Sequence, residues 1–213
     1  DGKEIFRRLV VGADVVVENY RPDVKFRLGI DYEALLGINP AIILGSISGF
    51  GQDGPYRDRP GVDQIAQGMG GLMSVTGLPG QGPVRAGTAV ADLASGLYLA
   101  IGILTALLQR EATGQGQWVH TSLLEAQIAL MDFQAARWLI GHEVPGQAGN
   151  NHPTAVPTGV YPTSDGHINI GSGGGQRWVR LCKAIGAEEL LDDPDYAGRE
   201  QRSKNRDALN AVL

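Results

Sequence analysis

The sequence has 213 residues, of which 43% are hydrophobic, so the chain is long enough to bury a sizeable core. The net charge is −5, with both signs interspersed and no basic stripe, which excludes the surface typical of nucleic-acid-binding proteins. A single cysteine, Cys182, excludes an internal disulfide and is typical of a reducing compartment, so we expect a cytoplasmic protein.

The N-terminal segment is typical of half a doubly wound α/β sheet. Residues 4–11 have helical periodicity, and the valine-rich segment 14–17 predicts a buried parallel strand. Asp31 is placed to cap a short helix over 32–36, and residues 41–44 predict a second buried strand. Two strands joined by a crossover helix form the repeating unit of a Rossmann-like sheet.

Loops dominate residues 49–91, where glycine, proline and charged residues are dense. The whole chain has 31 glycines, about twice the usual share. A short helix over 63–69 interrupts these loops. Long loops inside a compact protein are usually functional or disordered, and we expect these to build a site.

One carboxylate, Asp92, precedes the apolar run 93–108, and no Lys or Arg lies within six residues of it. The run is shorter than the roughly 20 residues that span a bilayer, so we expect a buried core helix and no membrane association. At the start of that helix, exposed N–H groups and the helix dipole would keep Asp92 ionised. Taken alone, the segment also fits an N-cap aspartate with no further role.

The middle of the chain continues the α/β pattern. Residues 117–120 predict a short strand. Ser122 and Glu125 then form a capping box, which predicts a helix to about Ile140.

The C-terminal part predicts a different arrangement. Residues 159–170 are typical of a β-hairpin with an Asp-Gly turn. The glycine-rich loop 171–176 leads into a helix over 177–185, where the apolar context predicts that Cys182 is buried.

Several kinds of site find no support in the sequence. The four histidines and Cys182 are too scattered for a metal site, so we expect none. A Gly-x-Ser-x-Gly elbow is absent, which argues against a serine hydrolase. The loop 171–176 is not followed by Gly-Lys-Ser/Thr, so it is not a Walker phosphate loop.

A set of motifs in a fixed order is more specific than any single one. They are Asn19-Tyr-Arg-Pro22 with Arg27-Leu-Gly29, the segment Asp63 to Gly77, the segment Gly87 to Gly96 around Asp92, Thr121 to Ala126, Asn151-His-Pro153, Asp165-Gly166 and the loop 171–176. This set resembles the family III CoA-transferases, the group that includes formyl-CoA transferase and the carnitine CoA-transferases. The resemblance covers essentially the whole chain.

The resemblance implies an α/β fold with part of a Rossmann-like doubly wound parallel sheet, a helical linker and a smaller α+β domain. The implied segments are 1–91, a partial CoA-binding domain with site loops, 92–155, the core and linker helices, and 156–213, the start of the smaller domain. Stretches at both ends of the family pattern are missing, and the chain begins without methionine, so we expect a fragment of a longer protein. Whether it is active alone stays open. Family members form interlocked dimers, so the resemblance implies a homodimer.

The resemblance also implies a reaction. Asp92 would attack an acyl-CoA thioester to give a mixed anhydride, which the released thiolate would convert to an aspartyl-CoA thioester. A free carboxylic acid would then take the CoA by the reverse sequence. The implied partners are an acyl-CoA and a small carboxylic acid, with no tightly bound cofactor, and their identities stay open. Arg85, close to Asp92 in sequence, could hold the acceptor carboxylate and favour a dicarboxylate such as succinate.

Further site residues are implied by their positions in the family pattern. Asp63 matches an acidic position beside the active site, although Val62 replaces the aromatic residue that often precedes it. The loop residues match a mobile lid over the nucleophile; they are Gly173, Gly174, Gly175 and Gln176. Other residues match the CoA groove or could replace its phosphate-binding lysine; they are Asn19, Tyr20, Arg21, Arg27 and Arg57.

Two other functions stay open. An α-methylacyl-CoA racemase resembles this fold but needs a histidine where the chain has Val62, which cannot move a proton. A catalytically silent CoA-binding or assembly module is the second alternative, because the chain lacks parts of the family pattern.

Overall fold

The computed structural model describes residues 2–213, which form two compact units. The first contains the residues up to Val75 together with Pro83–Pro145. The second contains Thr76–Gly82 and Gly146–Leu213. The segment limits predicted from the sequence stay a prediction.

A parallel sheet forms the centre of the first unit. Its strands are β1 (Val15–Glu18), β2 (Ile43–Ser48) and β3 (Trp118–Ser122), in the order β1-β2-β3. The register pairs Val16 with Leu44 and Gly45 with Val119. Parallel strands need covering on both faces, which explains their apolar sequences. This sheet confirms the predicted α/β class.

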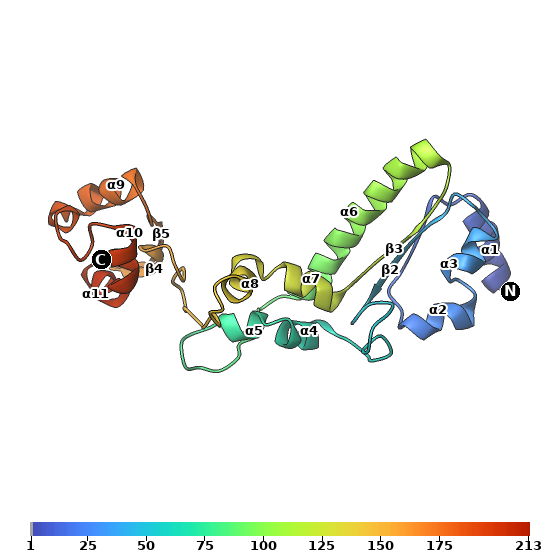
Figure 1. Ribbon diagram of the computed structural model, residues 1–213, viewed down its shortest axis with the longest axis horizontal. Helices are drawn as coiled ribbons and strands as arrows, with labels where there is room; N and C mark the ends of the chain where they lie inside the picture. Colours follow the sequence, from blue (N-terminus) through green and yellow to red (C-terminus); the bar gives the residue numbers. More distant parts are fainter. Residues whose placement is uncertain (1) are drawn as a thin grey trace. The chain divides into compact units, whose positions relative to one another are not determined.

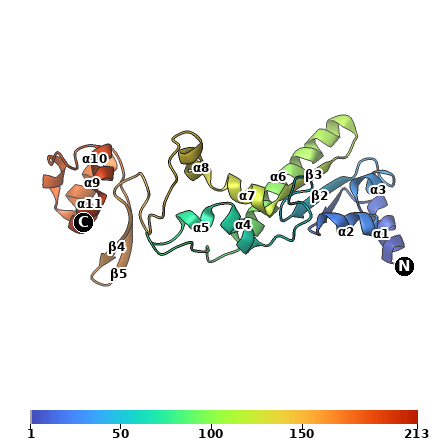
Figure 2. The ribbon, with the colours of Figure 1, turned by 60° about the horizontal axis from the view of Figure 1, so that its bottom comes forward.

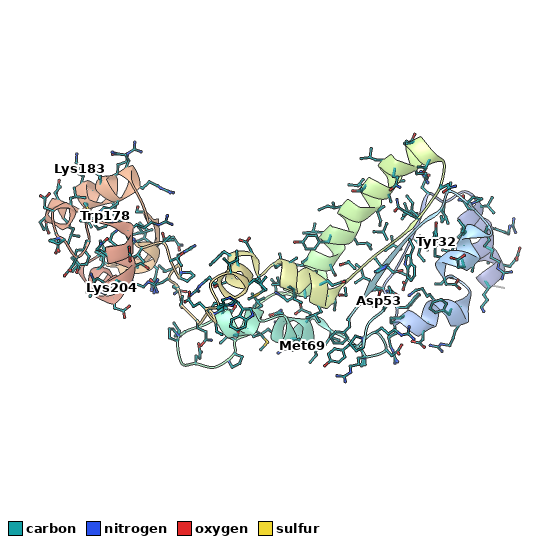
Figure 3. All side chains as sticks on the ribbon, in the orientation of Figure 1. Tyr32, Asp53, Met69, Trp178, Lys183 and Lys204 are labelled. Atoms are coloured by element: carbon teal, nitrogen blue, oxygen red, sulfur yellow. The ribbon has the colours of Figure 1, made fainter. Side chains whose placement is uncertain are left out.

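Three N-terminal helices lie along one side of the sheet (Figure 1). They are α1 (Gly2–Val11), α2 (Pro22–Leu28) and α3 (Tyr32–Leu36). Their core contains Val10, Leu35 and Leu44, and the ring of Tyr32 packs against it (Figure 3). The Asp31 carboxylate accepts the Ala34 N–H and caps α3 as predicted. Helix α2 was not predicted, although proline in a first turn is a known starting signal.

Helix α6 (Val90–Thr113) covers the opposite side of the sheet. Glycines allow the close approach: a Cβ on Gly45 would lie 2.9 Å from Cδ1 of Ile103, and one on Gly102 would lie 2.6 Å from Cγ1 of Val119. The expectation of a wholly buried core helix is wrong for the described residues, because an apolar stripe faces outward. The stripe contains Leu93, Leu97, Ile101, Leu104 and Leu108.

Length and composition alone would allow α6 to cross a membrane, and it is the one such helix in residues 2–213. One helix of this kind is weak evidence for a membrane protein. Its contacts with β2 and β3 give it a structural role in the α/β layer.

Four short helices complete the first unit. They are α4 (Asp63–Met69), α5 (Leu72–Val75), α7 (Leu123–Ala129) and α8 (Asp132–Leu139). Ser122 Oγ accepts the Glu125 N–H, as the capping box predicts. The single helix predicted to reach Ile140 is wrong, because the chain breaks before Asp132, whose φ is 44°. Aspartate is among the residues that tolerate this left-handed conformation.

The second unit contains a hairpin and a group of helices (Figure 2). Strands β4 (Thr158–Thr163) and β5 (Gly166–Gly171) pair antiparallel, as the Asp-Gly turn predicts. The helical elements are α9 (Gln176–Ile185), the 3-10 helix η1 (Glu188–Leu191), α10 (Arg199–Lys204) and α11 (Arg206–Val212). Trp178 from α9 points into the core of this unit (Figure 3). Cys182 from the same helix is buried there, which confirms the predicted buried thiol. Burial raises the pKa of Cys182.

Candidate active site

A cavity of about 360 Å³ opens in the first unit beside the carboxyl ends of the strands. Ligands of open α/β sheets bind at this edge. Strands β1 and β2 end here, and α4, α6 and α7 begin here. The lining residues are Asn19, Ile47, Ser48, Gly49, Gly61, Val62, Asp63, Asp92, Ser95 and Leu123. The cavity therefore brings together Asp92, Asp63 and Asn19 from the predicted site.

Two glycines bring the loop of residues 49–61 against itself at the cavity wall. A Cβ added to Gly49 would lie 2.4 Å from Cα of Gly61, and the reverse distance is also 2.4 Å. No side chain fits at such a separation. The glycine richness of this loop thus has a structural cause at these positions, where two backbones touch beside the site.

Asp92 is the third residue of α6, and its side chain is exposed to the cavity. It is not the N-cap, because that position belongs to Ala89. Among residues 2–213 no group donates a hydrogen bond to its carboxylate, whereas its backbone carbonyl accepts the Ser95 hydroxyl at 2.8 Å. The simpler interpretation, an aspartate used only as a cap, does not describe this geometry.

Desolvation by neighbouring groups raises the pKa of Asp92, and the nearby negative charge of Asp63 raises it further. The expectation that the helix start keeps Asp92 ionised stays a prediction, and these two effects act against it. Burial and a like charge both destabilise the ionised form. A carboxylate with a raised pKa is a stronger base and a better nucleophile than an ordinary one.

Asp63 has the opposite character. It is 7% exposed, and both of its carboxylate oxygens accept hydrogen bonds. Oδ1 accepts the Ala91 N–H at 2.9 Å. Oδ2 accepts the Gln67 amide at 2.7 Å and lies 3.4 Å from the Arg85 guanidinium. The carboxylate of Asp63 is thus fixed in place by hydrogen bonds, whereas that of Asp92 accepts none from the described residues.

The sequence patterns did not predict a role for Gln67, which is completely buried on α4. Its amide nitrogen also donates to Thr88 O at 3.1 Å, and its amide oxygen accepts the Ala86 N–H at 2.9 Å. Its spacing of four residues from Asp63 was the available signal, because residues i and i+4 meet on one helix face. No sequence pattern predicts that the backbone N–H of Ala91 donates to Asp63.

The residues predicted for CoA binding lie in different places. Asn19 lines the cavity, whereas Tyr20 lines a separate cavity of about 260 Å³ beside α1. Arg21 and Arg27 are exposed and form ion pairs with Asp23 at 3.8 and 3.1 Å. The structure therefore does not bring these two arginines to the cavity that contains Asp92.

Arg57 is also not among the residues that line that cavity. It is exposed and forms an ion pair with its neighbour Asp58 at 3.4 Å. The adjacent Arg59 lies 4.0 Å from the centroid of the Tyr56 ring. A role of Arg57 in CoA binding stays a prediction.

The glycine loop belongs to the second unit, between β5 and α9. Gly173 fits closely against Ala155, since a Cβ there would lie 2.9 Å from the alanine Cβ. Gly174 and Gly175 have open space around them, and Gly175 has a φ of +53°. Glycine adopts this conformation without strain. The lid role predicted for the loop stays a prediction, as does that of Gln176.

Acidic, histidine and cysteine side chains do not assemble into a possible metal site anywhere in residues 2–213. The ionisable groups that line the cavity are the carboxylates of Asp63 and Asp92, and the guanidinium of Arg85 lies beside that of Asp63.

Comparison with known proteins identifies relatives of this chain. The pattern of CoA-transferase family III matches residues 1–213. The succinate–glutarate CoA-transferase of Agrobacterium fabrum is 40% identical over 213 residues, which are 100% of this chain and 53% of that protein. The acetyl-CoA:oxalate CoA-transferase of Acetobacter aceti is 40% identical over 212 residues, 99% of this chain and 54% of that protein.

A solved structure shows the same fold. The crystal structure of a CAIB/BAIF family protein from Brucella suis superposes with a TM-score of 0.84 at 40% identity. The match covers 99% of this chain and 56% of the Brucella chain. The chain thus spans about half the length of the proteins that it matches.

Proposed function

Because the chain belongs to CoA-transferase family III, we propose that the protein of which it is a part transfers coenzyme A from an acyl-CoA to a free carboxylic acid, with Asp92 as the nucleophile. One observation carries the proposal: at the cavity, the carboxylate of Asp92 is exposed, has a raised pKa and accepts no hydrogen bond from the described residues. The relatives named above are CoA-transferases.

The reaction begins at the thioester. An Asp92 oxygen attacks the acyl carbon, the carbon–sulfur bond breaks, and CoA leaves as thiolate from a mixed anhydride. The thiolate attacks the aspartyl carbonyl and releases the donor acid, which leaves an aspartyl-CoA thioester. The acceptor carboxylate attacks that thioester, giving a second anhydride and thiolate. The thiolate then attacks the acceptor acyl carbon, which forms the new acyl-CoA and restores Asp92.

Two carboxylates face the cavity, and their hydrogen bonds separate their roles. A nucleophilic oxygen needs a free lone pair and room for the incoming carbonyl. Asp63 uses its oxygens to hold Ala91, Gln67 and Arg85. Asp92 keeps its oxygens available, so the attack is assigned to Asp92 and a supporting role to Asp63.

The racemase alternative requires a proton-transferring group beside the second carboxylate. Val62 lines the cavity at that position and offers only methyl groups. A valine can neither accept nor donate a proton. The residue before Asp63 therefore favours transfer over isomerisation.

We further propose that one of the two acids is a dicarboxylate. The relatives' names contain succinate, glutarate and oxalate. Arg85 is 41% exposed, and its contact with Asp63 is long at 3.4 Å. A guanidinium has five N–H donors, so Arg85 keeps several for a second carboxylate.

The remaining expectations belong to the same proposal. The loop Gly173 to Gln176 acts as a lid that offers N–H groups to the oxyanions formed at Asp92. Asn19, Tyr20, Arg21, Arg27 and Arg57 contribute to CoA binding. The active form is an interlocked homodimer of the full-length protein.

The decisive experiment is to trap the covalent intermediate. Full-length protein is incubated with succinyl-CoA and hydroxylamine, digested and analysed by mass spectrometry. A hydroxamate on Asp92 is expected, with Asp92→Asn as the control that gives none. A folded, CoA-binding protein without any adduct or transfer would identify a silent module. Exchange of the α-proton of an acyl-CoA in deuterated water, without an acceptor acid, would identify a racemase.

A further inference from the structure

We propose that Gln67 is a positioning residue that holds the nucleophile in place from a different helix. It acts through Asp63 and through the backbone that leads into α6. The inference rests on the proposed function, since it takes Asp92 to be the group that reacts.

The amide of Gln67 is completely buried, and both its nitrogen and its oxygen form hydrogen bonds. Its nitrogen donates to Asp63 Oδ2 at 2.7 Å and to Thr88 O at 3.1 Å. Its oxygen accepts the Ala86 N–H at 2.9 Å. Because two acceptors face the nitrogen and one donor faces the oxygen, only one orientation of the amide satisfies every partner. No carboxylate or hydrocarbon side chain of this size offers the same set of groups.

These bonds hold the start of α6, which has no cap of its own. The N-cap residue is Ala89, whose side chain cannot accept a hydrogen bond. Asp63 supplies the missing acceptor by taking the N–H of Ala91, which lies 28 positions further along the chain. Ala91 directly precedes Asp92, so the position of Asp63 determines where the backbone of Asp92 lies.

Gln67 supports the start of α6 in two ways. Through Asp63 it fixes the group that caps Ala91, and through Ala86 and Thr88 it fixes the three-residue approach to the N-cap. Misplacing a reacting group by about 1 Å can reduce a rate by about a hundredfold. Losing the amide should therefore lower the rate of attack far more than it weakens the binding of acyl-CoA.

The chain offers a matched control in Gln127 on α7. This glutamine is also completely buried, but neither of its amide atoms has a hydrogen-bond partner among the described residues. Replacing it with methionine removes the same groups from a helix at a similar burial. Gln127 shares no hydrogen bond with Gln67 or with the partners of Gln67 among the described residues.

The test compares Gln67→Met with Gln127→Met in the full-length enzyme, using succinyl-CoA and glutarate. For Gln67→Met we expect kcat to fall at least tenfold, KM for succinyl-CoA to stay within about threefold, and the hydroxamate on Asp92 to form correspondingly slowly. For Gln127→Met we expect kcat within about twofold of the wild type. A folded Gln67→Met enzyme with the kcat of the Gln127 variant overturns the proposal.

A second variant, Gln67→Glu, tests the same proposal if the methionine variant does not fold. Its carboxyl can donate one hydrogen bond when protonated and none when ionised. The charged groups around it are Asp63 and Arg85, with Asp92 beyond them. The ratio of its kcat to that of the wild type should rise as the pH falls, and a ratio independent of pH overturns the proposal. Unchanged activity of Asp92→Asn would instead refute the proposed function itself.

Discussion

The carboxylate of Asp63 accepts the backbone N–H of Ala91 at 2.9 Å, so a residue of α4 caps the first turn of α6. The next residue is Asp92, whose pKa is raised in part by the charge of that same cap. One acidic side chain therefore places the second and makes it more basic. This relationship gives direct predictions for both residues.

Replacing Asp92 with asparagine should abolish transfer and leave the fold intact. The folded protein holds the proton of Asp92 more tightly than an unfolded chain, so its ionised form lowers stability as the pH rises through the shifted pKa. A neutral amide removes that cost, and the thermal midpoint at pH 7 should equal or exceed that of the wild type. Calorimetry alongside a transfer assay tests this. A marked loss of stability would contradict it.

The pH dependence of transfer should report the raised pKa of Asp92. Attack requires the ionised carboxylate, so kcat/KM should fall as the pH drops through that pKa, which lies above the ordinary 3.8 of aspartate. Asp63→Asn removes the neighbouring negative charge and should move the acidic limb to lower pH. Profiles of both proteins measured at constant ionic strength test the direction. An unmoved limb, or a shift to higher pH, would rule out the charge coupling.

Arg85→Ala should distinguish acids by their number of carboxylates. We expect KM for a dicarboxylate such as glutarate to rise at least tenfold, while KM for a monocarboxylate changes little, because only the dicarboxylate has a second charge to pair. Charge-assisted hydrogen bonds contribute about 1.5–3 kcal/mol each, which corresponds to a loss of this size. Steady-state kinetics with paired acids of equal chain length provide the measurement. Equal effects on both acids would assign Arg85 a purely structural role.

Substituting either member of the glycine contact should damage the cavity wall. A Cβ at Gly61 would lie 2.4 Å from Cα of Gly49, so Gly61→Ala must push the loop of residues 49–61 away from the site. Overpacking of this kind costs about 1–3 kcal/mol. The control is Gly12→Ala, because nothing lies within 4 Å of a Cβ there. Denaturant unfolding compares the two, and equal stabilities would show that the loop yields without cost.

The buried ion pair between Lys25 and Glu18 should stabilise the fold only while both partners are present. Lys25 Nζ lies 3.4 Å from Glu18 Oε1 in an ion pair, and both side chains are almost fully buried. The lysine also donates a hydrogen bond to Gln52 Oε1 at 2.5 Å. Lys25→Met leaves a buried carboxylate alone and should cost about 3–5 kcal/mol. The double variant with Glu18→Gln should recover part of that loss. A double-mutant cycle by urea unfolding tests it, and strict additivity would exclude the coupling.

Local sequence patterns predicted the elements that depend on near neighbours. The valine-rich segment became β1, the capping residues Asp31 and Ser122 accept the expected hydrogen bonds, and Cys182 is buried. Each of these features depends on periodicity or on a bond within three or four residues. The break before Asp132 escaped prediction, because an apolar helical pattern runs through it without a glycine or proline.

The sequence by itself determined the α/β class, the family motifs and the choice of Asp92 as the residue of interest, because strand and helix periods and ordered motifs are properties of the chain. The tertiary structure alone decided what surrounds that residue. Gln67, Asp63 and Ala91 meet only once α4 packs beside α6. The pKa of Asp92 is raised first by desolvation in the folded chain and further by the charge of Asp63. Desolvation and charge coupling act through space, over distances that only the folded chain sets.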